Sequence, residues 1–227
     1  MDFAHLHVHS NYSLLQGAAT IGQLVETAAG AGMPALALTD TNGLYGAVSF
    51  YRAAREASMK PILGAEIVHG GQQCACLAAD RRGYANLCRI ITERQLHYTE
   101  HRRPETGEED DSGYDIARSI AAAPEGLFVL SATPSLLRRL HGRLPEGRLY
   151  AEVRADAPHS FETRCPALRT ATAPHRSRSE DRRPVADIAD RLDIPPVATV
   201  NVNYLRPEDR RTHAVVSAIR ENVSLKS

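Results

Sequence analysis

The chain of 227 residues is long enough for one full α/β domain or two small ones, and its composition, 43% hydrophobic and 24% charged, is that of an ordinary globular protein. Lysine and arginine together number 27, as do aspartate and glutamate, so no overall positive charge favours tight DNA binding by this segment. Aromatic residues make up 5% and tryptophan is absent, which argues against stacking platforms for single-stranded nucleic acid.

The first third of the chain alternates short apolar runs with stretches of helical periodicity. Strands are predicted over residues 3–9, 35–40, 60–67 and 72–79, and helices over 21–33, 44–58 and 84–97. Thr20 is placed to cap the first helix, and Gly32 and Pro34 to end it. Strands and helices alternating at such short intervals predict a parallel sheet or barrel with helices outside.

The pattern continues less regularly in the second half. Strands are predicted over 126–131, 148–153 and 195–201, and helices over 134–141, 185–193 and 207–221. Residues 99–113 are highly charged and residues 173–184 are basic and rich in serine, so we expect both to be flexible surface loops. The arginines between Arg176 and Arg183 are a possible nucleic-acid contact, although a solvated loop is the simpler interpretation.

Cysteine usage predicts a reduced, cytoplasmic protein. Cys74, Cys76, Cys88 and Cys165 show no CxxC spacing, and the sequence has no signal peptide or long apolar run, so no membrane contact is expected. A disulfide between Cys74 and Cys76 is not expected, because alternate residues of a strand lie too far apart with parallel side chains.

Three histidines stand at alternate positions near the beginning of the sequence. In an extended strand His5, His7 and His9 would share one face, and a polar loop follows them. This arrangement is typical of a pair of metal-binding histidines at the end of a strand. The alternative is a solvated or hydrogen-bonded strand face.

Several collinear segments carry a family resemblance: HLHVHSNYSLLQG, ALALTDTNGLYGAVSFY, KPILGAEI and, near the end, PPVATVNVNYLRPEDRRTHAVVSAIRE. They resemble the PHP (polymerase and histidinol phosphatase) domain, in the version that opens the alpha subunit of bacterial DNA polymerase III and above all its error-prone relative. The resemblance implies an α/β fold, a distorted seven-stranded β/α barrel with helices outside and metal ligands at the carboxyl ends of its strands. Active members hold two or three divalent metals and hydrolyse phosphoesters, and some polymerase versions show a metal-dependent 3′–5′ exonuclease.

The resemblance also implies which residues belong to the metal site. His7 and His9 match the family's His-x-His, and Glu66 matches a glutamate placed to bridge metals. At the remaining ligand positions, neutral residues replace the family's acids, histidines or cysteine: Gln16, Thr41, Gln95, Ala132 or Thr133, Asn201 and Asn203. Asp40, in the segment LTD, is retained.

Neutral side-chain oxygens bind Zn²⁺ or Mn²⁺ poorly compared with imidazole or carboxylate. A cluster of two or three ions needs several anionic ligands, so we expect either no metal or one weakly bound divalent ion at His7, His9 and Glu66. Asn for Asp and Gln for His preserve volume and hydrogen-bonding capacity. The cavity is therefore predicted to be filled by hydrogen bonds and water.

Other histidines leave alternatives open. His97 and His101 have the i, i+4 spacing of a metal pair, and a shift in register could return His97 to the site, although an exposed face is simpler. His213 is expected to have a packing or surface role, and His5 a hydrogen-bonded role deeper in the barrel. The sequence contains no G-x-S-x-G elbow, P-loop or G-x-G-x-x-G fingerprint.

Together these features predict a single PHP domain over residues 1–227, from or derived from a bacterial C-family polymerase alpha subunit. Its metal site is largely degenerate, with no confident catalytic residue. The expected role is a structural or partner-binding scaffold in DNA replication or translesion repair. Its partners would be the remainder of a C-family polymerase or other replication and repair subunits, with DNA contacted indirectly. The alternative is a metal-dependent phosphoesterase or 3′–5′ exonuclease using His7, His9 and Glu66.

Overall fold

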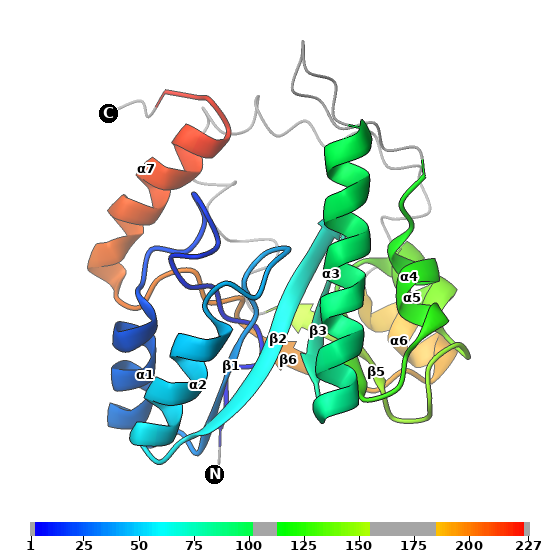
Figure 1. Ribbon diagram of the computed structural model, residues 1–227, viewed down its shortest axis with the longest axis horizontal. Coiled ribbons are helices and arrows are strands. Elements are labelled where there is room, and N and C mark those ends of the chain that lie inside the picture. Colours follow the sequence, from blue (N-terminus) through cyan, green and yellow to red (C-terminus); the bar gives the residue numbers. More distant parts are fainter. Residues whose placement is uncertain (1–2, 102–112, 155–184, 225–227) are drawn as a thin grey trace.

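A curled six-stranded sheet organises the part of the chain that the computed structural model describes, residues 3–101, 113–154 and 185–224 (Figure 1). The strands follow one another in chain order: β1 (Ala35–Leu38), β2 (Lys60–His69), β3 (Gln72–Ala78), β4 (Leu127–Ser131), β5 (Leu149–Arg154) and β6 (Pro196–Thr199). β1 and β2 are parallel, as are β4, β5 and β6, while β3 runs antiparallel to both of its neighbours. The carboxyl ends of five strands therefore meet at one edge.

Most helices cover the outside of the sheet in two groups, and the last helix of the chain lies apart from both (Figure 1). Their bounds are α1 (Ile21–Gly30), α2 (Ala47–Glu56), α3 (Arg81–His101), α4 (Ile116–Ala122), α5 (Pro134–Leu140), α6 (Val185–Leu192) and α7 (Arg210–Arg220), with a 3-10 turn, η2 (Pro207–Asp209), before α7. α1 and α2 pack with β1 in one apolar core, and α3 to α6 share a second core with β2 to β5. Both cores hold the sheet curled, so that its carboxyl edge can gather side chains from distant segments.

α1 illustrates how the sequence pattern forms its helix. Thr20 accepts a hydrogen bond from the backbone of Gln23, whose side chain returns to the Thr20 backbone in a capping box. The buried residues Ile21, Leu24, Val25 and Ala28 recur at helical spacing and face the core. The predicted cap is therefore confirmed.

The predicted seventh strand is not formed within the described ranges. Residues 5–9 do lie beside β1, where Ala37 N donates to His5 O at 2.9 Å and Thr39 N to Val8 O at 2.8 Å. On the other side they meet the segment after β6 at a single bridge between Val8 and Val202. The left-handed backbone of Asn201, with φ of 43°, bends the chain away there, so pairing cannot extend into a ladder.

The predictions for the loops, the shorter helices and the cysteines can also be compared with the structure. The predicted loop over 99–113 begins too early, because α3 continues to His101, and the short helix α4, capped by Asp115, was not predicted. Residues 102–112 and 155–184, which include the second predicted loop, its arginines and Cys165, lie outside the described residues. Cys74 and Cys76 are free, with their sulfur atoms 3.8 Å apart, as predicted. In the described ranges, no helix has the length and apolar character needed to cross a membrane.

Candidate metal centre

Three buried side chains meet at the carboxyl edge of the sheet. His7 and His9 come from the N-terminal segment and Glu66 from β2, and their potential ligand atoms all lie within 4.8 Å of one another. The segment carrying the histidines is fixed on one side by β1 and on the other by Val202. The grouping predicted from the sequence is thus brought together in space.

His7 is oriented by a carboxylate that the sequence analysis missed. Its Nδ1 donates to Glu152 Oε1 at 2.6 Å, and Glu152, from β5, also accepts from Thr199 Oγ1 at 2.7 Å. The other ring nitrogen, Nε2, lies 3.4 Å from Glu66 Oε1 and, among the described residues, is buried without a hydrogen-bond partner. A metal-binding histidine usually donates the N–H of one ring nitrogen to a carboxylate. This hydrogen bond fixes the ring so that the other nitrogen faces the metal site.

His9 is held in the matching orientation by a serine. Ser13 Oγ donates to Asp40 Oδ1 at 2.7 Å, so its lone pairs can accept from His9 Nδ1 at 3.0 Å. His9 Nε2 then faces inward, 3.8 Å from Glu66 Oε2. The amide nitrogen of Gln16 lies 3.3 Å from the same Nε2 and competes for its lone pair.

Asp40 organises the loop that follows the histidines. Its carboxylate accepts from the Ser10 backbone and hydroxyl, each at 2.7 Å, in addition to Ser13. The loop is so tight that a Cβ on Gly17 would lie 2.0 Å from Ser10 O. Asp40 therefore acts as a buried anchor of the loop.

Gln16 and Thr41, two of the substituted positions, line the group directly. Thr41 Oγ1 lies 3.2 Å from Glu66 Oε2 and 3.0 Å from Gln16 Oε1. A hydroxyl and an amide thus surround the carboxylate where the family resemblance implies a histidine and an aspartate.

Asn201 and Asn203 lie beside the His7–His9 segment through the backbone pairing of Val202. Asn203 Nδ2 donates to the Asn201 carbonyl at 2.8 Å. Both side-chain oxygens are buried and find no hydrogen-bond donor within the residues described. They present neutral oxygens, which are poor ligands for zinc or manganese.

Gln95 and Thr133 lie further from the three ligands. Gln95 Nε2 donates to Asn42 O at 2.8 Å, and the Asn42 backbone in turn donates to Glu66 O at 2.7 Å. Thr133 Oγ1 donates to Gln73 O at 3.2 Å. Both side chains therefore make hydrogen bonds to backbone around the site.

Arg154 is a second residue that the sequence analysis missed. Its Nη2 lies 3.1 Å from Glu152 Oε2 and 3.8 Å from Glu66 Oε1. With the Gln73 amide turned so that its oxygen faces the guanidinium, that oxygen accepts from Arg154 at 2.7 and 3.2 Å. Glu152 and Arg154 stand at alternate positions of the strand RLYAEVR, and this charged alternation in an apolar run was the available signal.

The buried charges shift the pKa of each member. Burial lowers the pKa of His7, but its hydrogen bond to Glu152 and the negative charges of Glu152 and Glu66 outweigh it and raise the pKa to about 9. Burial lowers the pKa of His9 to about 4, although Glu66 opposes this. Burial tends to raise the pKa of Glu66, but the close contact with His7 and the nearby charges of His9 and Arg154 lower it to about 2. At neutral pH this gives a protonated His7, a neutral His9 and an ionised Glu66.

These residues fit one divalent ion and not a cluster. The buried His7 Nε2, the inward His9 Nε2 and Glu66 form a three-ligand set of the kind that holds zinc. Binding there requires His7 to lose its second proton, which opposes the affinity. Beyond these three, the described surroundings of Glu66 are a hydroxyl, amides and the Arg154 guanidinium, which do not fit a second ion.

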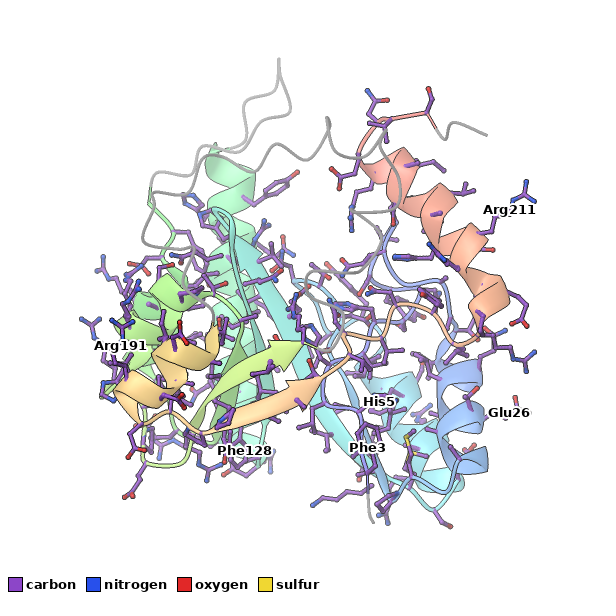
Figure 2. The ribbon with its side chains drawn as sticks, turned by 180° about the vertical axis from the view of Figure 1, so that it is seen from behind. Phe3, His5, Glu26, Phe128, Arg191 and Arg211 are labelled. Atoms are coloured by element: carbon purple, nitrogen blue, oxygen red, sulfur yellow. The ribbon has the colours of Figure 1, made fainter. Side chains whose placement is uncertain are left out.

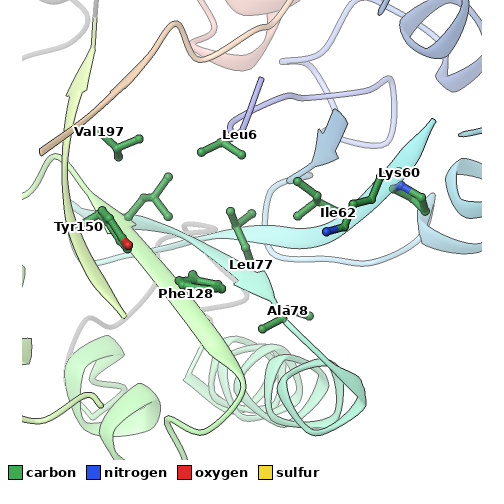
Figure 3. A pocket seen from close by; sticks show the side chains of 11 residues that line it. Leu6, Lys60, Ile62, Leu77, Ala78, Phe128, Tyr150 and Val197 are labelled. Atoms are coloured by element: carbon green, nitrogen blue, oxygen red, sulfur yellow. The ribbon is translucent and has the colours of Figure 1, made fainter. Parts of the chain in front are cut away.

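A separate hollow of the sheet lies away from this centre. A cavity of about 460 Å³ is lined mainly by apolar side chains from the opposite edge, including Ile62, Leu77, Phe128 and Tyr150, with Lys60 beside it (Figure 3). Among the described residues, no histidine or carboxylate lines it. Its described lining therefore offers no set of imidazole and carboxylate ligands for a metal ion.

The other candidate histidines whose side chains the structure describes do not join the metal group; the side chain of His101 lies outside the described part. His5 packs edge-on against Phe3, with ring centroids 4.8 Å apart (Figure 2). His97 packs edge-on against His69 at 5.3 Å, so the predicted exposed face is wrong and the alternative return to the site is also not seen. His213, on α7, lies with Nδ1 2.9 Å from Gln16 O, which fits the expected packing role.

Comparison with known proteins agrees with this geometry. The family model described as PHP domain matches residues 5–156, about two thirds of the chain. The chain belongs to the PHP domain family. The match contains His7, His9, Glu66, Glu152 and Arg154, whereas Asn201 and Asn203 lie beyond it.

Relatives of this PHP domain are DNA polymerases. The error-prone DNA polymerase of Symbiobacterium thermophilum is 34% identical over 245 residues, covering 97% of this chain and 21% of that protein. DNA polymerase III subunit alpha of Buchnera aphidicola is 29% identical over 242 residues, covering 99% and 19%. The chain thus spans about a fifth of the length of these relatives.

Solved structures share the fold of this PHP domain. A candidate metal-dependent phosphoesterase from Bifidobacterium adolescentis matches with a TM-score of 0.52 and 14% identity, covering 95% of this chain and 96% of that one. An amidohydrolase from Chromobacterium violaceum, with sulfate and no metal bound, matches with a TM-score of 0.52 and 15% identity, covering 94% and 96%. At these identities the likeness concerns the fold alone.

Proposed function

We propose that this chain, over residues 1–227, is one PHP domain of a polymerase-like protein, serving as a structural or partner-binding scaffold in DNA replication or translesion repair. One observation carries the proposal: in the described chain, Glu66 is the single carboxylate in the ligand group. Ions held close together need several anionic ligands to offset their mutual repulsion. Neutral oxygens at Gln16 and Thr41 do not supply that charge.

The buried network supports a scaffold because its charges are balanced by the chain itself. Protonated His7 and Arg154 offset Glu66 and Glu152, and the charged atoms are joined by short contacts. This network ties the N-terminal segment to β2 and β5. The site thereby stabilises the fold through hydrogen bonds and ion pairs.

An exposed apolar surface supports partner binding. Tyr45, Val48 and Tyr51 recur at intervals of three residues at and along α2, and their exposed fractions are 71%, 63% and 50%. Tyr12, from the loop after the histidines, lies against Gly46 at the start of the same helix. Clustered exposed aromatic residues are typical of interaction surfaces. In a longer polymerase-like chain, a neighbouring domain or subunit is the proposed partner.

A second function, a metal-dependent phosphoesterase or 3′–5′ exonuclease, is favoured by the buried His7 Nε2 and its carboxylate support. A zinc or manganese ion held by His7, His9 and Glu66 would supply a Lewis acid to polarise a phosphoryl oxygen. Glu152 would fix the His7 ring, and Ser13 would fix the His9 ring, with Nε2 of each directed inward. The same residues would thus position the ligands for chemistry.

Metal analysis combined with a hydrolysis assay separates the two functions. The chain is purified without chelator, its zinc and manganese are measured, and hydrolysis of a phosphomonoester and of single-stranded DNA is followed with added Mn²⁺. The scaffold proposal expects substoichiometric metal and no hydrolysis. Near-stoichiometric metal and activity, both lost in a His7→Ala/His9→Ala variant, would instead establish the enzyme.

A further inference from the structure

The guanidinium of Arg154 lies between two buried carboxylates. Nη2 is 3.1 Å from Glu152 Oε2 and 3.8 Å from Glu66 Oε1, and Nε also donates to Glu152 Oε2 at 3.1 Å. The side chain of Arg154 is 13% exposed, against 3% for Glu66 and 0% for Glu152. Two buried carboxylates that contact the same group require positive charge nearby.

Arg154 is held in place from a separate strand. Gln73, on the antiparallel strand β3, places its amide oxygen 2.7 and 3.2 Å from the two terminal nitrogens when the amide is oriented to accept. Gln73 is itself tied to the start of α5, because its backbone donates to Thr133 Oγ1 at 3.3 Å. The guanidinium is therefore a fixed group of the site rather than a mobile surface charge.

A divalent ion bound to Glu66 would be within a few ångströms of this guanidinium, since Nη2 is 3.8 Å from Glu66 Oε1. At that range two positive charges repel strongly in a partly buried site. The guanidinium also occupies a lone pair of Glu152 through a hydrogen bond, and its positive charge faces Glu66 at 3.8 Å.

We propose that Arg154 is a resident cation that takes the electrostatic place of a divalent ion between Glu66 and Glu152 and thereby suppresses metal binding at His7, His9 and Glu66. The inference rests on the proposed scaffold function and names the residue that enforces it. Removing the guanidinium charge therefore allows zinc to bind more tightly to the three ligands already present.

The test compares Zn²⁺ affinity by calorimetry, and Co²⁺ absorption as a report of ligand geometry, in the wild-type chain, Arg154→Gln and Arg148→Gln. Arg148 is a matched control because it precedes the same strand and its guanidinium lies over the Phe128 ring, 4.1 Å from the centroid. Arg154→Gln is expected to bind Zn²⁺ on the order of 100-fold more tightly, and Arg148→Gln as the wild type does. Adding Glu66→Gln to Arg154→Gln is expected to abolish the gain.

Unchanged affinity in Arg154→Gln, or a gain that survives Glu66→Gln, overturns the proposal. If Arg154→Gln does not fold, Gln73→Ala serves instead, because it removes only the amide that holds the guanidinium. About a fivefold gain in Zn²⁺ affinity is expected for Gln73→Ala. An unchanged Zn²⁺ affinity in that variant then overturns the proposal. A wild-type chain that already holds zinc stoichiometrically contradicts the scaffold function, whereas a further gain in Arg154→Gln would still support the inference.

Discussion

Replacing Glu152 by Gln tests whether the His7–Glu152 pair stabilises the fold. Both side chains are fully buried and their atoms lie 2.6 Å apart. The rise in the pKa of His7 from 6.5 to about 9 is due to Glu152 first and Glu66 second, and corresponds to about 3 kcal/mol for the two together. Removing one partner of a buried ion pair costs a similar amount, about 3–5 kcal/mol. Glu152→Gln is therefore expected to lower the free energy of unfolding by about 3 kcal/mol at pH 6.

The sign of the pH dependence follows from the raised pKa. His7 binds its proton more tightly in the folded chain, so its contribution is complete below pH 6.5 and is lost as the pH rises through about 9. The difference in the free energy of unfolding between wild type and Glu152→Gln should therefore shrink from pH 6 to pH 10. The difference that remains at pH 10 is the loss of the ion pair between Arg154 and Glu152.

Urea unfolding in chelator-treated buffer at the two pH values provides the measurement. Glu146→Gln, at an exposed position, is the matched control and should change stability by less than about 0.5 kcal/mol. A loss for Glu152→Gln below about 1 kcal/mol at pH 6, or a loss of equal size at both pH values, would refute the reasoning.

Two further predictions concern the segments that position the histidines. Gly17→Ala places a Cβ 2.0 Å from Ser10 O and should destabilise the chain by about 2–3 kcal/mol in thermal unfolding. The control, Gly22→Ala, has nothing within 4 Å of its added Cβ and should be neutral or stabilising. Equal effects of the two substitutions would contradict the tight loop. Thr20→Ala removes the capping box of α1 and should cost about 1 kcal/mol, while Thr20→Ser should restore most of it in the same assay; an unchanged stability in Thr20→Ala would contradict the role of the cap.

Much of the fold was predictable from local patterns. The apolar alternation and periodicity predicted every strand of the sheet and most helices, because these elements bury one face and begin or end at recognisable residues such as Thr20. The seventh strand was not formed because Asn201 adopts a left-handed conformation, which depends on tertiary contacts. α4 was missed because it is a single short helix beside a highly charged stretch.

The candidate site was only partly predictable. His7, His9 and Glu66 could be grouped because the family resemblance assigns all three to one metal site, while spacing alone places only the histidines on a common strand face. Glu152 and Arg154 escaped because their role arises from sheet order, which brings β5 within reach of the N-terminal segment. The packing of His97 against His69 likewise depends on how α3 crosses the end of β2.

Native mass spectrometry of the chain at saturating Zn²⁺ or Mn²⁺ tests the central claim most directly, because it counts bound ions. The described site offers three ligands with one carboxylate, beside a fixed guanidinium. The account predicts at most one ion per chain, lost in His7→Ala/His9→Ala. Two or more ions per chain that depend on those histidines would contradict it.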